Sequence, residues 1–168
     1  LGSSASGLLR VSAAGGEVVP LTTLDTAKKE AGHILPQFLP DGRRFLFTAV
    51  PGNVVKLGSL DSSAQSEVLK VGTHASYAPP GYLLFARQGT LVAQRFDASS
   101  ATLSGDPVPV AENVRMLGGT WGLFSASQNG TLVHESGDTT AGGRPLWVDR
   151  KGQSTPVVPE GLDDAQYP

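Results

Sequence analysis

Histidine is the residue type in this sequence whose chemistry would matter most, because the chain has no cysteine and histidine serves as metal ligand or general base. The three histidines are His33, His74 and His134. His33 lies 9 residues before Gly42 and His74 lies 7 residues before Gly81. Both are therefore expected in loops at the same end of the fold, near one mouth of the central channel that a ring of sheets would enclose. Zinc normally needs three protein ligands in ordered positions. Loop histidines bonded to the backbone are therefore favoured over a shared metal site, and no metal or cofactor is predicted.

Serine and aspartate residues are numerous but do not form a recognisable catalytic motif. The Gly-x-Ser-x-Gly elbow of α/β-hydrolases does not occur in the sequence. Asp61, Asp97 and Asp149 each follow a short strand-like run, and this recurrence indicates turn capping by local hydrogen bonds to the backbone. The sequence therefore predicts no catalytic residue and no enzyme activity within these residues.

Aromatic and basic side chains offer a second route to function, as a recognition surface. Most aromatic residues fall in predicted strands, where packing would bury them. Trp121 is the exception, because it lies in the glycine-rich stretch 118–122 just before a predicted strand, with Arg115 nearby. The candidate ligand-facing loop residues are therefore His33, His74, Arg115 and Trp121.

The charge of the chain argues against one class of partner. The sequence has 13 basic and 15 acidic side chains, and a formal net charge of -2 gives no field strong enough to recruit nucleic acid. No apolar run approaches the roughly 20 residues that cross a bilayer, so direct membrane insertion is not expected. The chain begins at Leu1 without a signal-peptide pattern, and we expect residues upstream of it.

The elements that must position these residues are short strands. The 21 glycines and 12 prolines are spread along the chain and separate short runs of β-branched and aromatic residues. Helical periodicity is nearly absent, and residues 24–30 are expected to form an exposed loop with at most one helical turn. These patterns predict an all-β fold.

A strand, a glycine turn and a second strand occur in that order three times, around Gly42, Gly81 and Gly130. Two of these turns contain Asp-Gly or Asn-Gly, which favour tight hairpins. The remaining turn, around Gly81, would suit a type II turn with Pro80 in the second position and Gly81 in the third. Each hairpin is followed by a third strand and a short fourth one, and four strands per unit of about 40 residues are typical of a β-propeller.

The repeat divides the chain into blades. Residues 1–23 are predicted to be the outer strands of a preceding blade, residues 33–71, 74–112 and 121–160 complete blades, and residues 165–168 the start of the next one. The predicted fold class is an all-β β-propeller fragment, with about three complete four-stranded antiparallel blades and partial blades at both ends. Because propellers need four or more blades to close, the rest of the ring is expected in the same parent chain.

The turn at residues 36–42 resembles that of the WD40-like repeat of the TolB type, in which Pro-x-aromatic-x-Pro-Asp-Gly connects the first two strands. Residues 6–47, 77–91 and 105–112 are similar to the propeller that follows the kinase domain in acidobacterial serine/threonine protein kinases. The second repeat departs from this pattern, because Pro-Pro-Gly stands where Pro-Asp-Gly is usual.

The resemblance implies a non-catalytic binding or scaffold module, the sensory or protein-interaction part of a larger bacterial protein such as a serine/threonine kinase. Its partner would be a protein, a peptide or a small ligand, and its location would be the periplasmic side of the membrane. Two alternatives stay open, namely the gating propeller of a prolyl-oligopeptidase-like hydrolase and a periplasmic TolB-like scaffold. The sequence of the full-length protein would separate the three.

Overall fold

The computed structural model describes residues 1–118, 121–137, 146–149 and 152–157. These residues form short β-strands together with a single 3-10 turn, η1 (Thr26–Lys28). The predicted all-β class is confirmed. The 3-10 turn lies within residues 24–30, where one helical turn was expected, and none of the three residues of η1 is buried.

Three four-stranded antiparallel sheets follow one another along the chain. The first contains β3 (Gly32–Phe38), β4 (Arg44–Val50), β5 (Val54–Ser59) and β6 (Ser66–Lys70). The second contains β7 (Ala75–Ala78), β8 (Tyr82–Arg87), β9 (Thr90–Asp97) and β10 (Thr102–Ala111). The third contains β13 (Phe124–Ala126), β14 (Leu132–His134), β15 (Leu146–Val148) and β16 (Ser154–Pro156). In every sheet the strands pair in sequence order, which makes each one a meander.

Two further strand pairs flank these sheets. β1 (Leu9–Arg10) pairs with β2 (Val19–Pro20) within the predicted first segment. β11 (Met116–Leu117) pairs with β12 (Trp121–Gly122) between the second and third sheets, where the sequence had predicted only a loop. The predicted start of a next blade at residues 165–168 lies outside the described residues.

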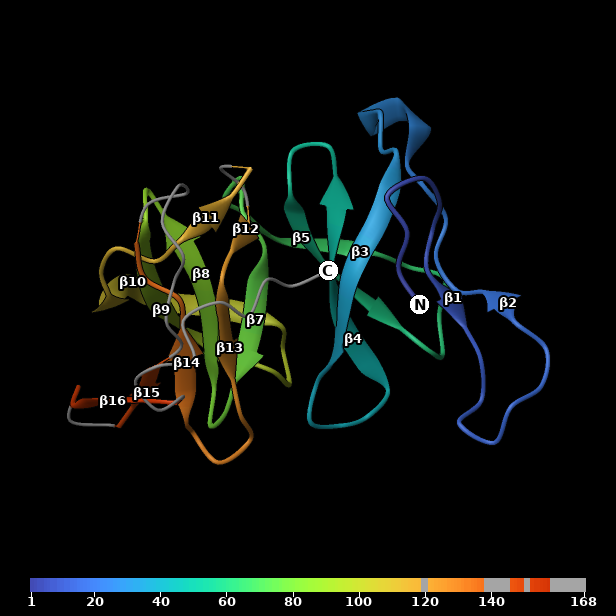
Figure 1. Cartoon of the computed structure of the whole chain (residues 1–168). Helices are drawn as coiled ribbons and strands as arrows, with labels where there is room; N and C mark the ends of the chain where they lie inside the picture. The colour runs from blue at the N-terminus through green and yellow to red at the C-terminus, as the bar shows by residue number, and fades with distance from the viewer. Residues whose placement is uncertain (119–120, 138–145, 150–151, 158–168) are drawn as a thin grey trace.

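The hairpins that join the first two strands of each sheet lie together at the lower end of the molecule in Figure 1. Gly42 and Gly130 adopt φ of 65° and 84°, as their tight turns require. The carboxylate of Asp41 accepts hydrogen bonds from the backbone N–H groups of Arg43 and Arg44, both at 2.9 Å. The hairpins predicted from the two dipeptides are therefore confirmed.

The turn at the second hairpin differs from the prediction. The N–H of Gly81 donates to the carbonyl oxygen of Ala78 at 3.3 Å, so the turn runs from Ala78 to Gly81. Pro79 takes the second position, which suits its fixed φ, and Pro80 takes the third. The predicted type II turn with Gly81 in the third position is therefore wrong.

The first and second sheets pack face to face. Along β4 and β8 the side chains alternate between the two faces of their sheets, so Leu46 points to the second sheet while Leu83 and Phe85 point back to the first. This shared core consists of the buried residues Leu39, Leu46, Val55, Ala75, Tyr77, Leu83, Phe85, Val92 and Phe96.

The remaining faces of these two sheets are also covered. Phe45 and Phe47 of β4 pack against Leu8 and Leu21 of the N-terminal segment. On the far side of the second sheet, Leu84, Leu91, Ala93 and Val114 pack against the partly buried residues Phe124, Ala126 and Leu132 of the third sheet. The layers therefore succeed one another in chain order, from the N-terminal segment to the third sheet.

One cross-strand row of each sheet faces the sheet that follows. In the first sheet this row is Gln37, Leu46, Leu57 and Ser66, and in the second it is Ser76, Leu84, Ala93 and Val108. The same register in the third sheet gives Ser125, Val133, Trp147 and Thr155. Trp147 is 47% exposed, whereas Ala93 at the equivalent position is 8% exposed.

This difference predicts unequal effects of substitution at equivalent positions. Leu57→Ala removes packing between two sheets and should lower the free energy of unfolding by about 2 kcal/mol. Trp147→Ala removes a side chain from an open face and should cost less than about 1 kcal/mol in this chain. Urea denaturation of both variants measures these losses. Equal losses would contradict the assignment of Leu57 to a covered row and of Trp147 to the equivalent, open row.

Candidate functional site

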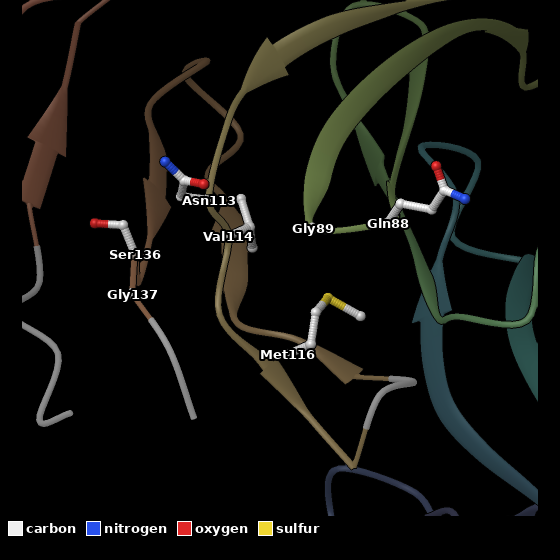
Figure 2. A pocket seen from close by; sticks show the side chains of 7 residues that line it. All are labelled: Gln88, Gly89, Asn113, Val114, Met116, Ser136 and Gly137. Carbon is white, nitrogen blue, oxygen red and sulfur yellow. The ribbon is translucent and has the colours of Figure 1, made fainter. Parts of the chain in front are cut away.

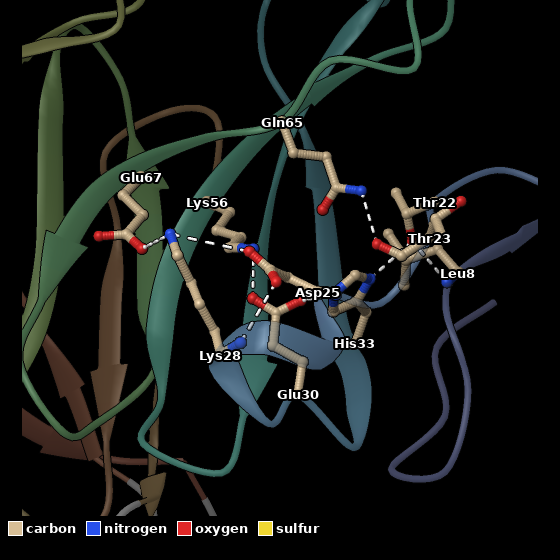
Figure 3. A network of polar contacts seen from close by, with 10 residues as sticks. All are labelled: Leu8, Thr22, Thr23, Asp25, Lys28, Glu30, His33, Lys56, Gln65 and Glu67. Atoms are coloured by element: carbon tan, nitrogen blue, oxygen red, sulfur yellow. Dashed lines mark hydrogen bonds and ion pairs between the residues drawn. The ribbon is translucent and has the colours of Figure 1, made fainter.

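A connected set of polar side chains is buried where the N-terminal segment meets the first sheet (Figure 3). His33 of β3 is fully buried; its Nδ1 lies 2.7 Å from Thr22 Oγ1 and its Nε2 lies 3.0 Å from Glu30 Oε2. The N–H of Leu8 donates to Thr22 Oγ1 at 2.7 Å. One neutral tautomer satisfies this set: Nε2–H donates to the carboxylate, and Nδ1 accepts the hydroxyl proton.

Glu30 is the centre of this network. Its Oε1 forms an ion pair with Lys56 of β5, which is 4% exposed, and its Oε2 accepts from the backbone N–H of Asp25 at 2.8 Å. Burial raises the pKa of Glu30, but hydrogen bonds from Lys56, the Asp25 N–H and His33 outweigh burial and lower it from 4.5 to about 2. Glu30 is therefore a carboxylate at neutral pH.

The order hydroxyl, imidazole and carboxylate in this network is also that of hydrolase triads. Here the imidazole of His33 is 0% exposed and both its nitrogens are occupied, by Thr22 and by Glu30. No face of the ring is open to a substrate. The network instead connects residues 8–30 to the first sheet, and the structure places His33 in the interior rather than on a loop surface.

The structure brings together two of the four residues that the sequence suggested. The ring of His74 stacks on Phe124, with centroids 4.7 Å apart and planes at 16°, and lies 5.8 Å from the ring of Trp121. Burial lowers the pKa of His74 to about 4, so the ring is neutral at neutral pH. Trp121 is 43% exposed and forms the open edge of this cluster.

Arg115 is occupied by a neighbouring element. Its guanidinium forms an ion pair with Glu135, and its backbone N–H donates to the Glu135 carbonyl oxygen at 2.8 Å. Arg115 thus holds the segment between the second and third sheets against the end of β14. Its charge is neutralised by Glu135 and is not presented to a ligand.

The turn-capping prediction holds for two of the three aspartates. Asp97 accepts from the N–H and the hydroxyl of Ser99 at 2.7 and 2.6 Å, and bonds from Ser99 and Ser100 lower its pKa to about 2. Asp149 accepts from the N–H of Gln153 at 3.0 Å. The Asp61 carboxylate pairs instead with the side chain of Arg43 across the hairpin.

A hollow of about 780 Å³ opens beside the Arg115–Glu135 pair, between the second and third sheets (Figure 2). Three segments line it: the β8–β9 turn, the link between the two sheets, and the residues after β14. Its lining residues are Gln88, Gly89, Asn113, Val114, Met116, Ser136 and Gly137. The hollow lies at the end of β8 opposite the β7–β8 hairpin, and its volume is within the range of ligand sites.

Backbone hydrogen bonds hold the three segments in place. The N–H of Val114 donates to the Gly89 carbonyl oxygen at 2.8 Å, and the N–H of Gly137 donates to the Asn113 carbonyl oxygen at 3.1 Å. Gln88 and Gly89 form a two-residue turn with φ of 52° and 78°, the combination of a type I′ hairpin. Sequence reasoning missed this hollow, because the only local signal is a single turn and the other walls come from distant residues.

Beside the buried network that Figure 3 shows lies a smaller hollow of about 180 Å³, which is lined in part by charged side chains. Lys28 and Glu67, which line it, pair with each other across it. Lys56, also in its wall, is held by Glu30. The larger hollow is therefore the better candidate for a binding site, since none of its described lining residues is ionisable and paired in this way.

Comparison with known proteins adds no identification. No family model, curated protein or solved structure matches the chain. Within the described residues, no three His, Cys, Asp or Glu side chains are grouped as a metal site would need, and no helix is long and apolar enough to span a membrane.

The buried ion pair predicts a large effect of removing one partner. Lys56→Met should leave Glu30 as an uncompensated buried carboxylate and lower the free energy of unfolding by about 3 kcal/mol. The control is Lys28→Met, which removes the exposed partner of Glu67 and should change stability little. Chemical denaturation of the two variants tests this; equal effects would show that burial does not distinguish the two pairs.

The lowered pKa of Glu30 predicts a pH dependence of stability. Because its folded pKa of about 2 lies below the ordinary 4.5, ionised Glu30 contributes stability above pH 4.5, and this contribution is lost as the pH falls toward 2. Glu30→Gln should therefore lose less stability than the wild type between those pH values. Denaturant midpoints measured across this pH interval test the prediction, and Glu17→Gln, at an exposed position, is the control. The same dependence of the midpoint on pH in the wild type and in Glu30→Gln would contradict it.

Proposed function

We propose that the chain is an arc of a β-propeller that works as a binding module and carries out no catalysis itself. Three successive meanders of the same strand order, stacked face to face with their first hairpins at one end, support the propeller part of the proposal. The exposed Trp147 row supports a further sheet of the same kind on the third one, because the two equivalent rows are covered by a neighbour.

The observation that carries the binding function is the hollow of about 780 Å³ at the loop end of the sheets. Rigid sheets that present loops of different sequence are a common arrangement for recognition. The polar groups in its wall are amides and a hydroxyl, which bind but do not activate water or substrate without a base.

The resemblance of residues 36–47 to the TolB-type repeat supports a narrower form of the proposal. In that form the chain is the sensory or protein-interaction part of a larger bacterial protein, such as a serine/threonine kinase, and lies on the periplasmic side of the membrane. The ring would be completed by residues of the same parent protein.

A thermal-shift screen with peptides and small molecules tests the proposed function. A binding module should be stabilised by at least one compound, and mass spectrometry should recover that compound unchanged after incubation. Conversion of the stabilising compound would contradict the non-catalytic proposal. Failure of every compound to raise the melting temperature would contradict a binding role.

A further inference from the structure

The larger hollow carries polar groups that the fold itself does not use. The side-chain amides of Gln88 and Asn113 are exposed, and the hydroxyl of Ser136 is half-buried. Within the described part of the chain these three groups form no hydrogen bond, whereas other amides, such as those of Gln37 and Gln94, are bonded to the backbone. The amides and the hydroxyl are therefore available to a ligand as donors and acceptors.

The electrostatics of the hollow select an uncharged ligand. None of its seven lining residues is ionisable. Of the described charged residues that adjoin the lining residues in sequence, Arg115 and Glu135 neutralise each other, and Arg87 and Glu112 carry opposite charges. A charged ligand would lose hydration on entering and would find no opposite charge among the described lining residues to compensate for that loss.

The arrangement of the walls suits an elongated ligand. Figure 2 shows Asn113 and Ser136 at one side of the hollow and Gln88 at the other, with the side chain of Met116 between them. The thioether of Met116 offers an adaptable apolar contact. Backbone hydrogen bonds from Val114 to Gly89 and from Gly137 to Asn113 hold the walls in position before any ligand arrives.

We propose that this hollow binds an extended, uncharged peptide segment, an inference that rests on the proposed binding function. Each amide side chain offers one acceptor and two donors, which match the C=O and N–H of a peptide group. Gln88 and Asn113 would hold the peptide backbone at two points, and an apolar peptide side chain would contact Met116. None of the described residues that line the hollow is aromatic, so a sugar or nucleobase ring finds no flat side chain among them to stack on.

Selection from a phage-displayed random peptide library on the full 168-residue chain tests this proposal. The enriched peptides should be uncharged and should contain an apolar residue. Their affinity, measured by fluorescence polarisation with labelled synthetic copies, should fall at least about tenfold for the double variant Gln88→Gly, Asn113→Gly, since two hydrogen bonds of roughly 1 kcal/mol each are lost. Glycine replaces both residues because their positions have φ of 52° and 55°.

The control is Gln128→Ala, which removes an exposed amide from the β13–β14 hairpin at the opposite end of the sheets and should keep the wild-type affinity. Equal melting temperatures of the three proteins would show that the fold is intact. Enrichment of charged peptides, or of none, would overturn the peptide class, as would binding of a neutral glycan that the double variant loses. Full affinity in the double variant would overturn the site but leave the proposed binding function standing.

Discussion

The structure depends on the packing of one sheet on the next, and that packing depends on strands that are apolar on both faces. In β4, Phe45 and Phe47 point one way and Leu46 the other; in β8, Leu83 and Phe85 point one way and Leu84 the other. A strand buried on both sides carries a continuous apolar run instead of alternating polar and apolar residues. Each such run therefore holds two neighbouring layers together and fixes their order along the chain.

Stacking of this kind leaves the ends of the strands free to vary. The lower end carries the hairpins that join the first two strands of each sheet, and the opposite end carries the links from one sheet to the next. Both hollows and the His74–Trp121 cluster involve these links or the turns beside them. The Glu30–Lys56 network also lies there, and it stabilises the connection between the N-terminal segment and the first sheet with polar contacts where apolar packing ends.

The parts of the fold that sequence reasoning predicted are those with local causes. Asp41-Gly42 and Asn129-Gly130 define hairpins by their own backbone preferences, and apolar runs on either side define the strands. For Pro79-Pro80-Gly81 the expected turn had Gly81 in the third position, whereas the hydrogen bond from the Gly81 N–H to Ala78 places Gly81 in the fourth.

The candidate site could not be predicted in the same way. Its walls come from the β8–β9 turn, the inter-sheet link and the end of β14, and these segments become neighbours only when the sheets stack. His33 was recognised as a residue of interest, but its partners Thr22 and Glu30 carry no spacing signal that points to it, so its burial became evident only in three dimensions.

Side-chain nuclear Overhauser effects measured on the labelled chain in solution test the stacking most directly. Face-to-face packing predicts cross-peaks from the methyl groups of Leu46 and Val55 to the side chains of Leu83 and Phe85, and from those of Leu84 and Leu91 to Phe124 and Leu132. Cross-peaks from Leu46 to Leu8 or Leu21, with none to the second sheet, would place this strand the other way round and contradict the order of layers.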